Sequence, residues 1–286
     1  MHNTLEYLIV ESILFSAAVV LHVAAIFILR KTNEDFIFTK VQKIFLINLS
    51  INEIFSAISH CLGKVATIYF AKQRTDSKYY IFFEITMGTF LPIWYMLIML
   101  VITIDRFLAV YLNLRYHLLV NQRKVKVLLF ILPVLSIFAT GVLNFVVKDN
   151  SSLTGVSNTL TVFRMAPALD VVCTLAFCFT YGYLFYQLRK KRRSTSVIET
   201  ENTQTKSKHT FFFPFLLILS FILLWMVPNW IHYAYYGFGK FVPVSFHWAV
   251  DLCYPLAFIC DAFIYIFSSP KVRNKTKTFW GRHFSL

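Results

Sequence analysis

Seven long apolar stretches follow one another along the chain, separated by shorter polar segments. A bilayer core of about 30 Å requires roughly 20 apolar residues in a helix, and each stretch reaches that length. A segment inside lipid must pair its own backbone N–H and C=O groups, so each stretch is predicted to be an α-helix. The predicted helices cover about residues 7–29, 44–70, 79–104, 125–147, 161–188, 211–236 and 241–267.

The short connections between these stretches predict one all-α membrane domain, a seven-transmembrane-helix bundle over residues 1–267. Residues 268–286 are predicted to form a cytoplasmic tail. The tail sequence SSPKVRNKTKTFWGRHF alternates basic and aromatic residues. This pattern is typical of an amphipathic helix on the inner membrane surface, and an ordinary solvated tail remains an equal alternative.

Composition and charge support the membrane assignment and set its orientation. Of the 286 residues, 57% are hydrophobic and 15% are charged, against about a quarter charged in soluble domains. The formal net charge of +14 would suggest nucleic-acid binding in a soluble protein. Here three in four of the 28 lysines and arginines fall in the segments on one side of the bundle. The positive-inside rule therefore predicts an outer N-terminus, a cytoplasmic C-terminus and no nucleic-acid partner.

One charged pair, Asp105-Arg106, ends the third apolar stretch in the string VITIDRFLAVYLNLRYH, residues 101–117. A juxtamembrane arginine that reaches the lipid headgroups would explain Arg106 alone. It would explain neither the adjacent aspartate nor the rest of the string. The string resembles the Asp-Arg-Tyr segment of rhodopsin-like (class A) G-protein-coupled receptors. The resemblance implies that Asp105 restrains Arg106, that Arg106 meets the G protein on activation, and that Leu114 anchors it. Asn113 stands where the family usually has proline.

Segments of three other helices are similar to motifs of the same family. Residues 48–53 (NLSINE) resemble the second-helix motif, with Glu53 for aspartate, and residues 261–265 (DAFIY) resemble the seventh-helix motif. Residues 225–228 (WMVP) resemble the sixth-helix motif, with the tryptophan one position early. The resemblance implies that Tyr181 and Tyr265 act with Arg106 in activation. It also implies a transmission switch formed by Trp225 and Pro228.

Departures from the family pattern indicate a branch. Ile81 stands where the family has the cysteine of its outer disulfide bridge, and the fifth helix lacks proline at its usual place. With the string Leu114-Arg115-Tyr116-His117, these features are similar to the melanocortin, cannabinoid and lysophospholipid receptors.

Two carboxylates, Glu53 and Asp261, are expected to face each other at the centre of the bundle. In the family this region holds a sodium ion, which acts as an allosteric ligand. Tyr95 stands where a small residue usually completes the ion's shell, and its bulk fills that place. Like charges in a low-dielectric interior cannot both ionise cheaply. The sequence therefore leaves two alternatives, a bound sodium ion or a protonated hydrogen-bonded pair, and it predicts no other cofactor.

Ionisable residues inside spans are functional candidates. Carboxylates in the outer halves of the third, fifth and seventh helices, together with nearby aromatic residues, would favour a cationic ligand. An equal alternative pairs Glu84 with Lys72 or Lys78 near the headgroups. The expected pocket residues are Glu84, Gly88, Asp170, His232, Tyr233, His247, Trp248 and Asp251.

Two classes of ligand fit the sequence poorly. Gly88 stands where amine receptors of the family carry aspartate, and Pro255 stands where opsins carry the lysine that binds retinal. A glycosylation acceptor, Asn150-Ser151-Ser152, lies in the largest outer loop, on the correct side of the membrane for that modification.

These features predict a plasma-membrane G-protein-coupled receptor. It would bind an extracellular small molecule or short peptide within the bundle and activate a heterotrimeric G protein. The altered second-, sixth- and seventh-helix motifs leave an alternative, a receptor-like membrane scaffold or trafficking partner that does not signal. The sequence contains no recognisable catalytic triad and no metal-ligand spacing, so neither an enzyme nor a metal site is expected.

Overall fold

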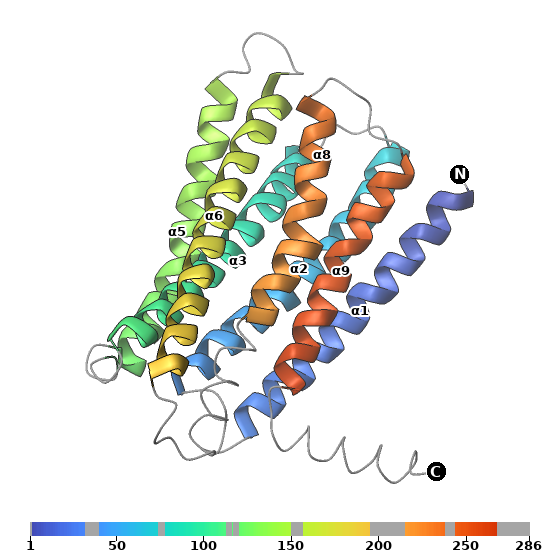
Figure 1. The fold of residues 1–286 in the computed structure, drawn as a ribbon. Coiled ribbons are helices and arrows are strands. Elements are labelled where there is room, and N and C mark those ends of the chain that lie inside the picture. The colour runs from blue at the N-terminus through green and yellow to red at the C-terminus, as the bar shows by residue number, and fades with distance from the viewer. Residues whose placement is uncertain are drawn as a thin grey trace, which may run out of the picture.

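The computed structural model describes residues 2–31, 40–73, 78–112, 116, 120–149, 157–194, 215–237 and 244–267. These residues form a bundle of seven helical rods (Figure 1), which confirms the predicted fold class. The rods are α1 (His2–Lys31), α2 (Lys40–Gln73), α3 (Lys78–Leu112), α5 (Gln122–Asp149), α6 (Ser157–Ser194), a sixth rod from residue 215 that includes η3 (Ile222–Met226) and α8 (Val227–Gly237), and α9 (Val244–Phe267).

The order of the rods in space differs from their order in the chain. The first and last helices, α1 and α9, pack side by side, and α1 also packs on α2. The third helix, α3, packs on α2, α5 and α6. Side chains from the beginning, middle and end of the chain therefore meet near α3. Within the part of the chain that the structure describes, five helices are long and apolar enough to cross a membrane, and the segments Val171–Gln187 and Phe215–Ile231 are shorter apolar helices.

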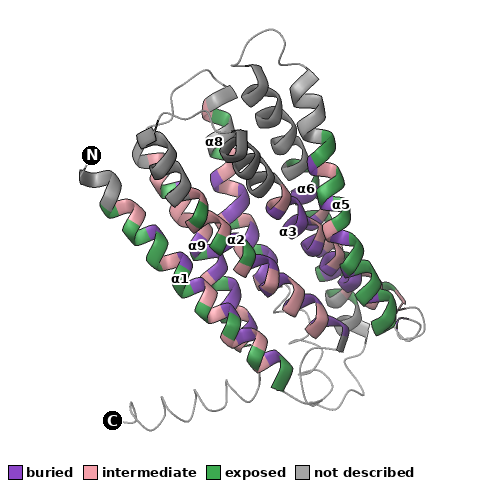
Figure 2. Ribbon diagram, turned by 180° about the vertical axis from the view of Figure 1, so that it is seen from behind, coloured by how far each residue is buried: buried purple, intermediate pink, exposed green. Residues whose placement is uncertain are grey.

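The outward surface of the bundle is apolar, whereas its interior contains charge. Large apolar side chains such as Phe130 and Phe138 of α5 and Phe179 of α6 are exposed. Exposed positions follow the outer faces of the rods in Figure 2. Fully buried positions include ionisable residues of α1, α2, α3 and α9. A soluble protein has the opposite distribution, because water solvates its charged surface and excludes its apolar core. The chain is a multi-pass membrane protein, and the lipid tails solvate its outer surface.

Helix α3 continues past the apolar stretch that the sequence marks, because the apolar segment FLAVYL allows the helix to run on to Leu112. Asp105 and Arg106 therefore lie inside the helix, before its last turns. Their backbone groups are paired, and only their side chains require partners.

Candidate functional site

The side chains of Asp105 and Arg106 form a buried ion pair at the end of the bundle where α3 finishes. Arg106 is 1% exposed, its Nε donates to Asp105 Oδ2 at 3.0 Å, and its Nη2 donates to the same oxygen. Tyr116, just beyond α3, donates its hydroxyl to Asp105 Oδ1. Both carboxylate oxygens are therefore occupied. A buried ion pair is stable only when further hydrogen bonds satisfy its remaining groups, and Tyr116 supplies one of them.

Tyr116 is a contact that sequence reasoning missed, since the residue entered only as one letter of the string LRYH. Burial raises the pKa of the Tyr116 hydroxyl above its ordinary value of 10.0, and the Asp105 carboxylate raises this pKa further. The hydroxyl therefore stays protonated, and remains a donor to Asp105, throughout the physiological range.

Replacing Tyr116 with phenylalanine should remove a stability term that depends on alkaline pH. Because the folded-state pKa of Tyr116 is raised, its contribution is fully present below the unfolded-state pKa of about 10 and is lost as the pH rises through the folded-state value. We expect the wild-type chain to exceed Tyr116→Phe by about 1–3 kcal/mol at pH 8, and this difference to shrink near pH 11. Thermal unfolding in detergent at both pH values measures it. A difference that does not change with pH would contradict the assignment.

Tyr181 of α6 is buried near this ion pair. Both Arg106 and Asp105 act on it electrostatically, and its hydroxyl has no hydrogen-bond partner among the described residues. Tyr265 of α9, the other tyrosine that the resemblance links to Arg106, instead donates its hydroxyl to Glu53 Oε1 at 3.4 Å. The structure thus brings Tyr181, but not Tyr265, to the Arg106 end. Leu114 lies outside the described residues.

The centre of the bundle holds a second polar cluster, formed by His22 of α1, Glu53 of α2 and Asp261 of α9. All three side chains are fully buried. The carboxyl groups of Glu53 and Asp261 are close enough to interact electrostatically, so the structure brings together the two residues expected to face each other. His22 Nε2 lies 3.0 Å from Glu53 Oε2 and 2.8 Å from the backbone oxygen of Phe258. Sequence reasoning missed His22, because no motif marks this position in the first apolar stretch.

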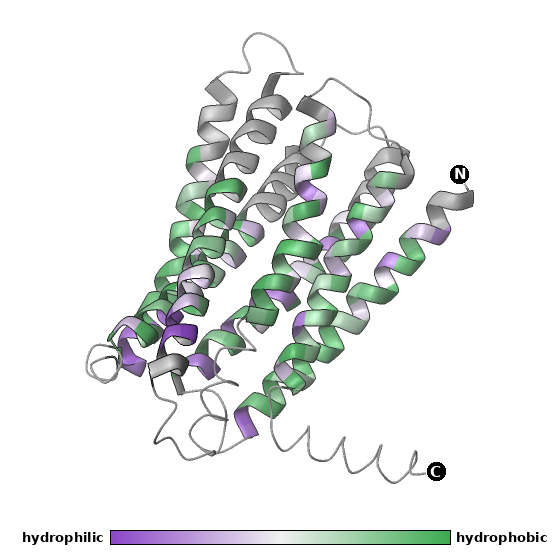
Figure 3. Cartoon of the chain, in the orientation of Figure 1, coloured by the Kyte–Doolittle hydropathy of each residue, from purple (hydrophilic) through white to green (hydrophobic). Residues whose placement is uncertain are grey.

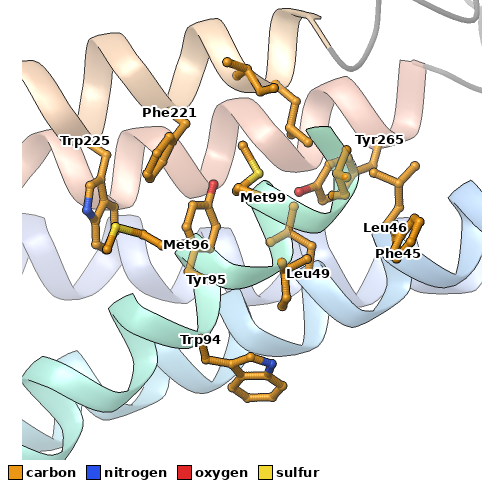
Figure 4. Close-up of a cluster of buried hydrophobic side chains, with 14 of the residues drawn as sticks. Phe45, Leu46, Leu49, Trp94, Tyr95, Met96, Met99, Phe221, Trp225 and Tyr265 are labelled. Carbon is orange, nitrogen blue, oxygen red and sulfur yellow. The ribbon is translucent and has the colours of Figure 1, made fainter. Parts of the chain in front are cut away.

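Tyr95 of α3 connects this central cluster to the sixth rod. Its hydroxyl donates to Asp261 Oδ2 at 2.7 Å. Its ring stacks on Trp225, with centroids 5.6 Å apart and planes at 14°, and packs against Phe221 at 5.2 Å (Figure 4). Trp225 also contacts Tyr254 of α9, with ring centroids 4.7 Å apart. A shift of Trp225 would therefore act directly on the ring whose hydroxyl holds Asp261.

A π-helical turn, η3, explains why Trp225 can make these contacts although the sequence places it one position early. The N–H of Val227 bonds to the carbonyl of Ile222, five residues earlier, so the turn contains one residue more than an α-turn. Pro228 follows, and it has no N–H to bond the carbonyl four residues before it. The regular series of α-helical hydrogen bonds is therefore interrupted at Pro228. The π turn absorbs the extra residue and keeps Trp225 facing α3.

The two central carboxylates each have one oxygen that accepts a tyrosine hydroxyl and one, Glu53 Oε2 and Asp261 Oδ1, that has no hydrogen-bond partner among the described residues. The sodium ion that the family resemblance implies therefore stays a prediction. A hard cation requires free oxygen ligands. Tyr95 already donates to one oxygen of Asp261, and Tyr265 donates to one of Glu53. The other oxygen of Glu53 lies beside His22 Nε2. Because a backbone carbonyl only accepts, the contact with Phe258 requires that Nε2 carry a hydrogen, and this hydrogen points to the Phe258 oxygen.

Two predicted pocket residues, Trp248 and Asp251, lie beside α1. Trp248 stacks on Tyr7, with ring centroids 5.3 Å apart, and its carbonyl accepts the Tyr7 hydroxyl at 3.3 Å. Asp251 interacts with Tyr7 as well. The other six pocket residues fall outside the described side chains, and their roles stay predictions, as does glycosylation of Asn150: Glu84, Gly88, Asp170, His232, Tyr233 and His247.

A known protein family matches most of the chain. The family model described as "Serpentine type 7TM GPCR chemoreceptor Srsx" matches residues 38–280, which include every described helix after α1. The matching family is one of receptors and not of enzymes. No curated protein matches the chain.

Proposed function

The chain belongs to the Srsx family of serpentine seven-transmembrane GPCR chemoreceptors, and from this membership we propose how it signals. It binds an extracellular chemical ligand, a small molecule or short peptide, between the outer halves of its helices at the plasma membrane. Binding biases a two-state bundle, and the inner end then activates a heterotrimeric G protein. The motifs around Arg106, Glu53 and Asp261 support a rhodopsin-like subclass. The melanocortin-like branch stays a prediction.

The buried ion pair of Arg106 is the observation that carries this proposal. Such a pair adds little to stability, because desolvation of both charges offsets much of their attraction, and apolar side chains of equal volume often stabilise a protein more. Arg106 is nevertheless buried, and it is held by Asp105, whose other oxygen binds Tyr116. An arginine that must be released on activation accounts for that cost. A scaffold that does not signal has no need of it.

The charge distribution supports a cytoplasmic position for the Arg106 end. Arg30 and Lys31 finish α1, and Arg189 and Lys190 lie near the end of α6. In Figure 3 the hydrophilic residues gather at this same end of the bundle, where α3 also finishes. Basic residues concentrate on the cytoplasmic side of membrane proteins. A G protein approaching from the cytoplasm would therefore meet Arg106.

Replacing Asp105 with asparagine tests the proposal. The carboxylate accepts two hydrogen bonds from the Arg106 side chain, so its loss should weaken the restrained state by about 1–2 kcal/mol. We expect basal G-protein activation to rise by about fivefold to thirtyfold. Guanine-nucleotide exchange on a panel of G-protein subtypes measures it, with the purified receptor in lipid nanodiscs.

Glu6→Gln is the matched control, since it makes the same kind of acid-to-amide change at an exposed position on α1. It should leave basal exchange unchanged. If neither the wild-type chain nor Asp105→Asn promotes exchange on any subtype, coupling is wrong and the scaffold alternative is favoured.

A further inference from the structure

The exposed side of α5 carries one continuous stripe of side chains, which is basic at the start of the helix and apolar beyond it. Residues three or four positions apart lie on the same face of a helix. The stripe begins with the exposed cations Arg123 and Lys126, and Phe130 in its apolar part is 77% exposed (Figure 2). Its members are Arg123, Lys126, Val127, Phe130, Val134 and Phe138.

The two cations of the stripe are not balanced within the described part of the chain. Neither Arg123 nor Lys126 forms an ion pair with a described residue. They lie at the start of α5, where the helix dipole presents its positive end and disfavours cations. In α1 an arginine and a lysine, Arg30 and Lys31, lie in the last turn, where the dipole favours them. The charges of α5 therefore fit an anion from outside the chain better than they fit their own helix.

A phospholipid presents negative charge and apolar chains in the same order as the stripe. A rise of about 1.5 Å per residue gives the apolar part, from Val127 to Phe138, a length of roughly 16 Å. Half of a bilayer core is about 15 Å thick, so one acyl chain can cover this length. A soluble anion would contact the basic end alone and leave the apolar part unused.

We propose that the start of α5 binds an anionic phospholipid selectively, with its headgroup between Arg123 and Lys126 and one acyl chain along the rest of the stripe. Basic residues next to a membrane span attract anionic lipids. A zwitterionic lipid fits less well, because its own ammonium group balances its phosphate. Selective binding does not depend on the proposed function, whereas the position of this lipid in the cytoplasmic leaflet does.

The lipid site lies beside the segment that supports the buried ion pair of α3. The Val120 N–H donates to the Tyr116 carbonyl at 2.9 Å. At the start of α5, the Lys124 N–H donates to Asn121 Oδ1 at 2.9 Å. Tyr116 in turn donates its hydroxyl to Asp105. Negative charge is favourable at the start of a helix, so a bound headgroup stabilises the backbone that leads from Tyr116 into α5.

Native mass spectrometry of the purified full chain, titrated in detergent with phosphatidylserine or phosphatidylcholine, measures the selectivity. We expect the tightest-bound phosphatidylserine to bind about tenfold to thirtyfold more tightly than phosphatidylcholine, since each basic residue contributes about a factor of five. Arg123→Gln combined with Lys126→Gln should remove this preference and leave the affinity for phosphatidylcholine unchanged. Equal affinity of the wild-type chain for both lipids would overturn the proposal.

Arg30→Gln combined with Lys31→Gln is the matched control. It removes an arginine and a lysine from exposed positions at the last turn of α1. We expect this variant to bind phosphatidylserine as tightly as the wild-type chain does. Equal losses of affinity in the two double variants would show that only the total charge of the protein attracts the lipid, and would contradict a site on α5.

Glycerophosphoserine, which is the headgroup without acyl chains, separates a lipid site from a site for any anion. We expect it not to displace phosphatidylserine when both are present at equal concentration. Displacement there would show that the apolar part of the stripe does not contribute, and would overturn the assignment to a lipid. None of these measurements involves a G protein, so a failure of the coupling assay does not affect their outcome.

Discussion

Replacing Arg106 with alanine should reduce G-protein activation by about 30-fold to 150-fold, to the background of a membrane without receptor. In the proposed mechanism the guanidinium leaves Asp105 and meets the G protein. A hydrogen bond to a charged group contributes about 1.5–3 kcal/mol, and 1.4 kcal/mol corresponds to a factor of ten. The loss of one such bond of about 2–3 kcal/mol accounts for the expected fall. Nucleotide exchange in nanodiscs measures it at equal receptor concentration.

The same substitution also leaves Asp105 buried without its counter-charge, which is destabilising by about 3–5 kcal/mol. Loss of folding must therefore be separated from loss of coupling. The double variant Asp105→Asn/Arg106→Ala removes both charges and should recover much of the Tm, because no unpaired charge remains. We expect it to remain inactive. If it activates the G protein as the wild-type chain does, then Arg106 only neutralises Asp105, and the coupling role is wrong.

Deleting Val227 should be tolerated, although the loss of one residue from the middle of a membrane helix is usually destructive. A deletion rotates the following part of an α-helix by about 100°, since 3.6 residues make one turn. The π turn at residues 222–226 already contains one extra residue. Without Val227 this turn can return to α geometry, with Trp225 still against Tyr95 and the rest of α8 in its place. We expect surface expression and Tm close to those of the wild-type chain.

Deletion of Ile131 is the matched control. Ile131 is exposed on the lipid side of α5, so the side chain itself contributes little to the packing of the bundle. Helix α5 is α-helical throughout and has no π turn to absorb the change. We expect this deletion to rotate the part of α5 that follows it, so that side chains that face lipid turn toward the bundle and buried side chains turn toward lipid. Surface expression should then be abolished. Flow cytometry of tagged receptors measures both. Equal loss of surface expression in the two deletion variants would contradict the interpretation that η3 contains one residue more than an α-helical turn.

The motifs that resemble the receptor family identified the helices that carry the polar clusters, but they did not identify every side chain that contacts these clusters. Asp105 and Arg106 are adjacent in the chain, so their pairing follows from the string itself. Tyr116 completes their site from beyond the end of α3, and no periodicity marks it. His22 illustrates the same limit, since its role depends on α1 lying against α9, which begins more than two hundred positions later in the chain. Such contacts are set by helix packing rather than by local sequence.

The sequence by itself determined the class of protein and its seven helices. Inside lipid, every spanning segment must form the hydrogen bonds of its own backbone groups. An apolar stretch long enough to span the bilayer therefore predicts a helix directly. The tertiary structure alone decided how the polar groups are used. It placed Tyr265 with Glu53 instead of Arg106, turned Trp225 toward Tyr95 through a π turn, and brought His22 to the central carboxylates. Each of these contacts depends on how a helix is rotated about its axis and on which helices lie beside it. A hydrophobic pattern in the sequence indicates which face of a helix is buried, but it does not identify the residues that this face contacts.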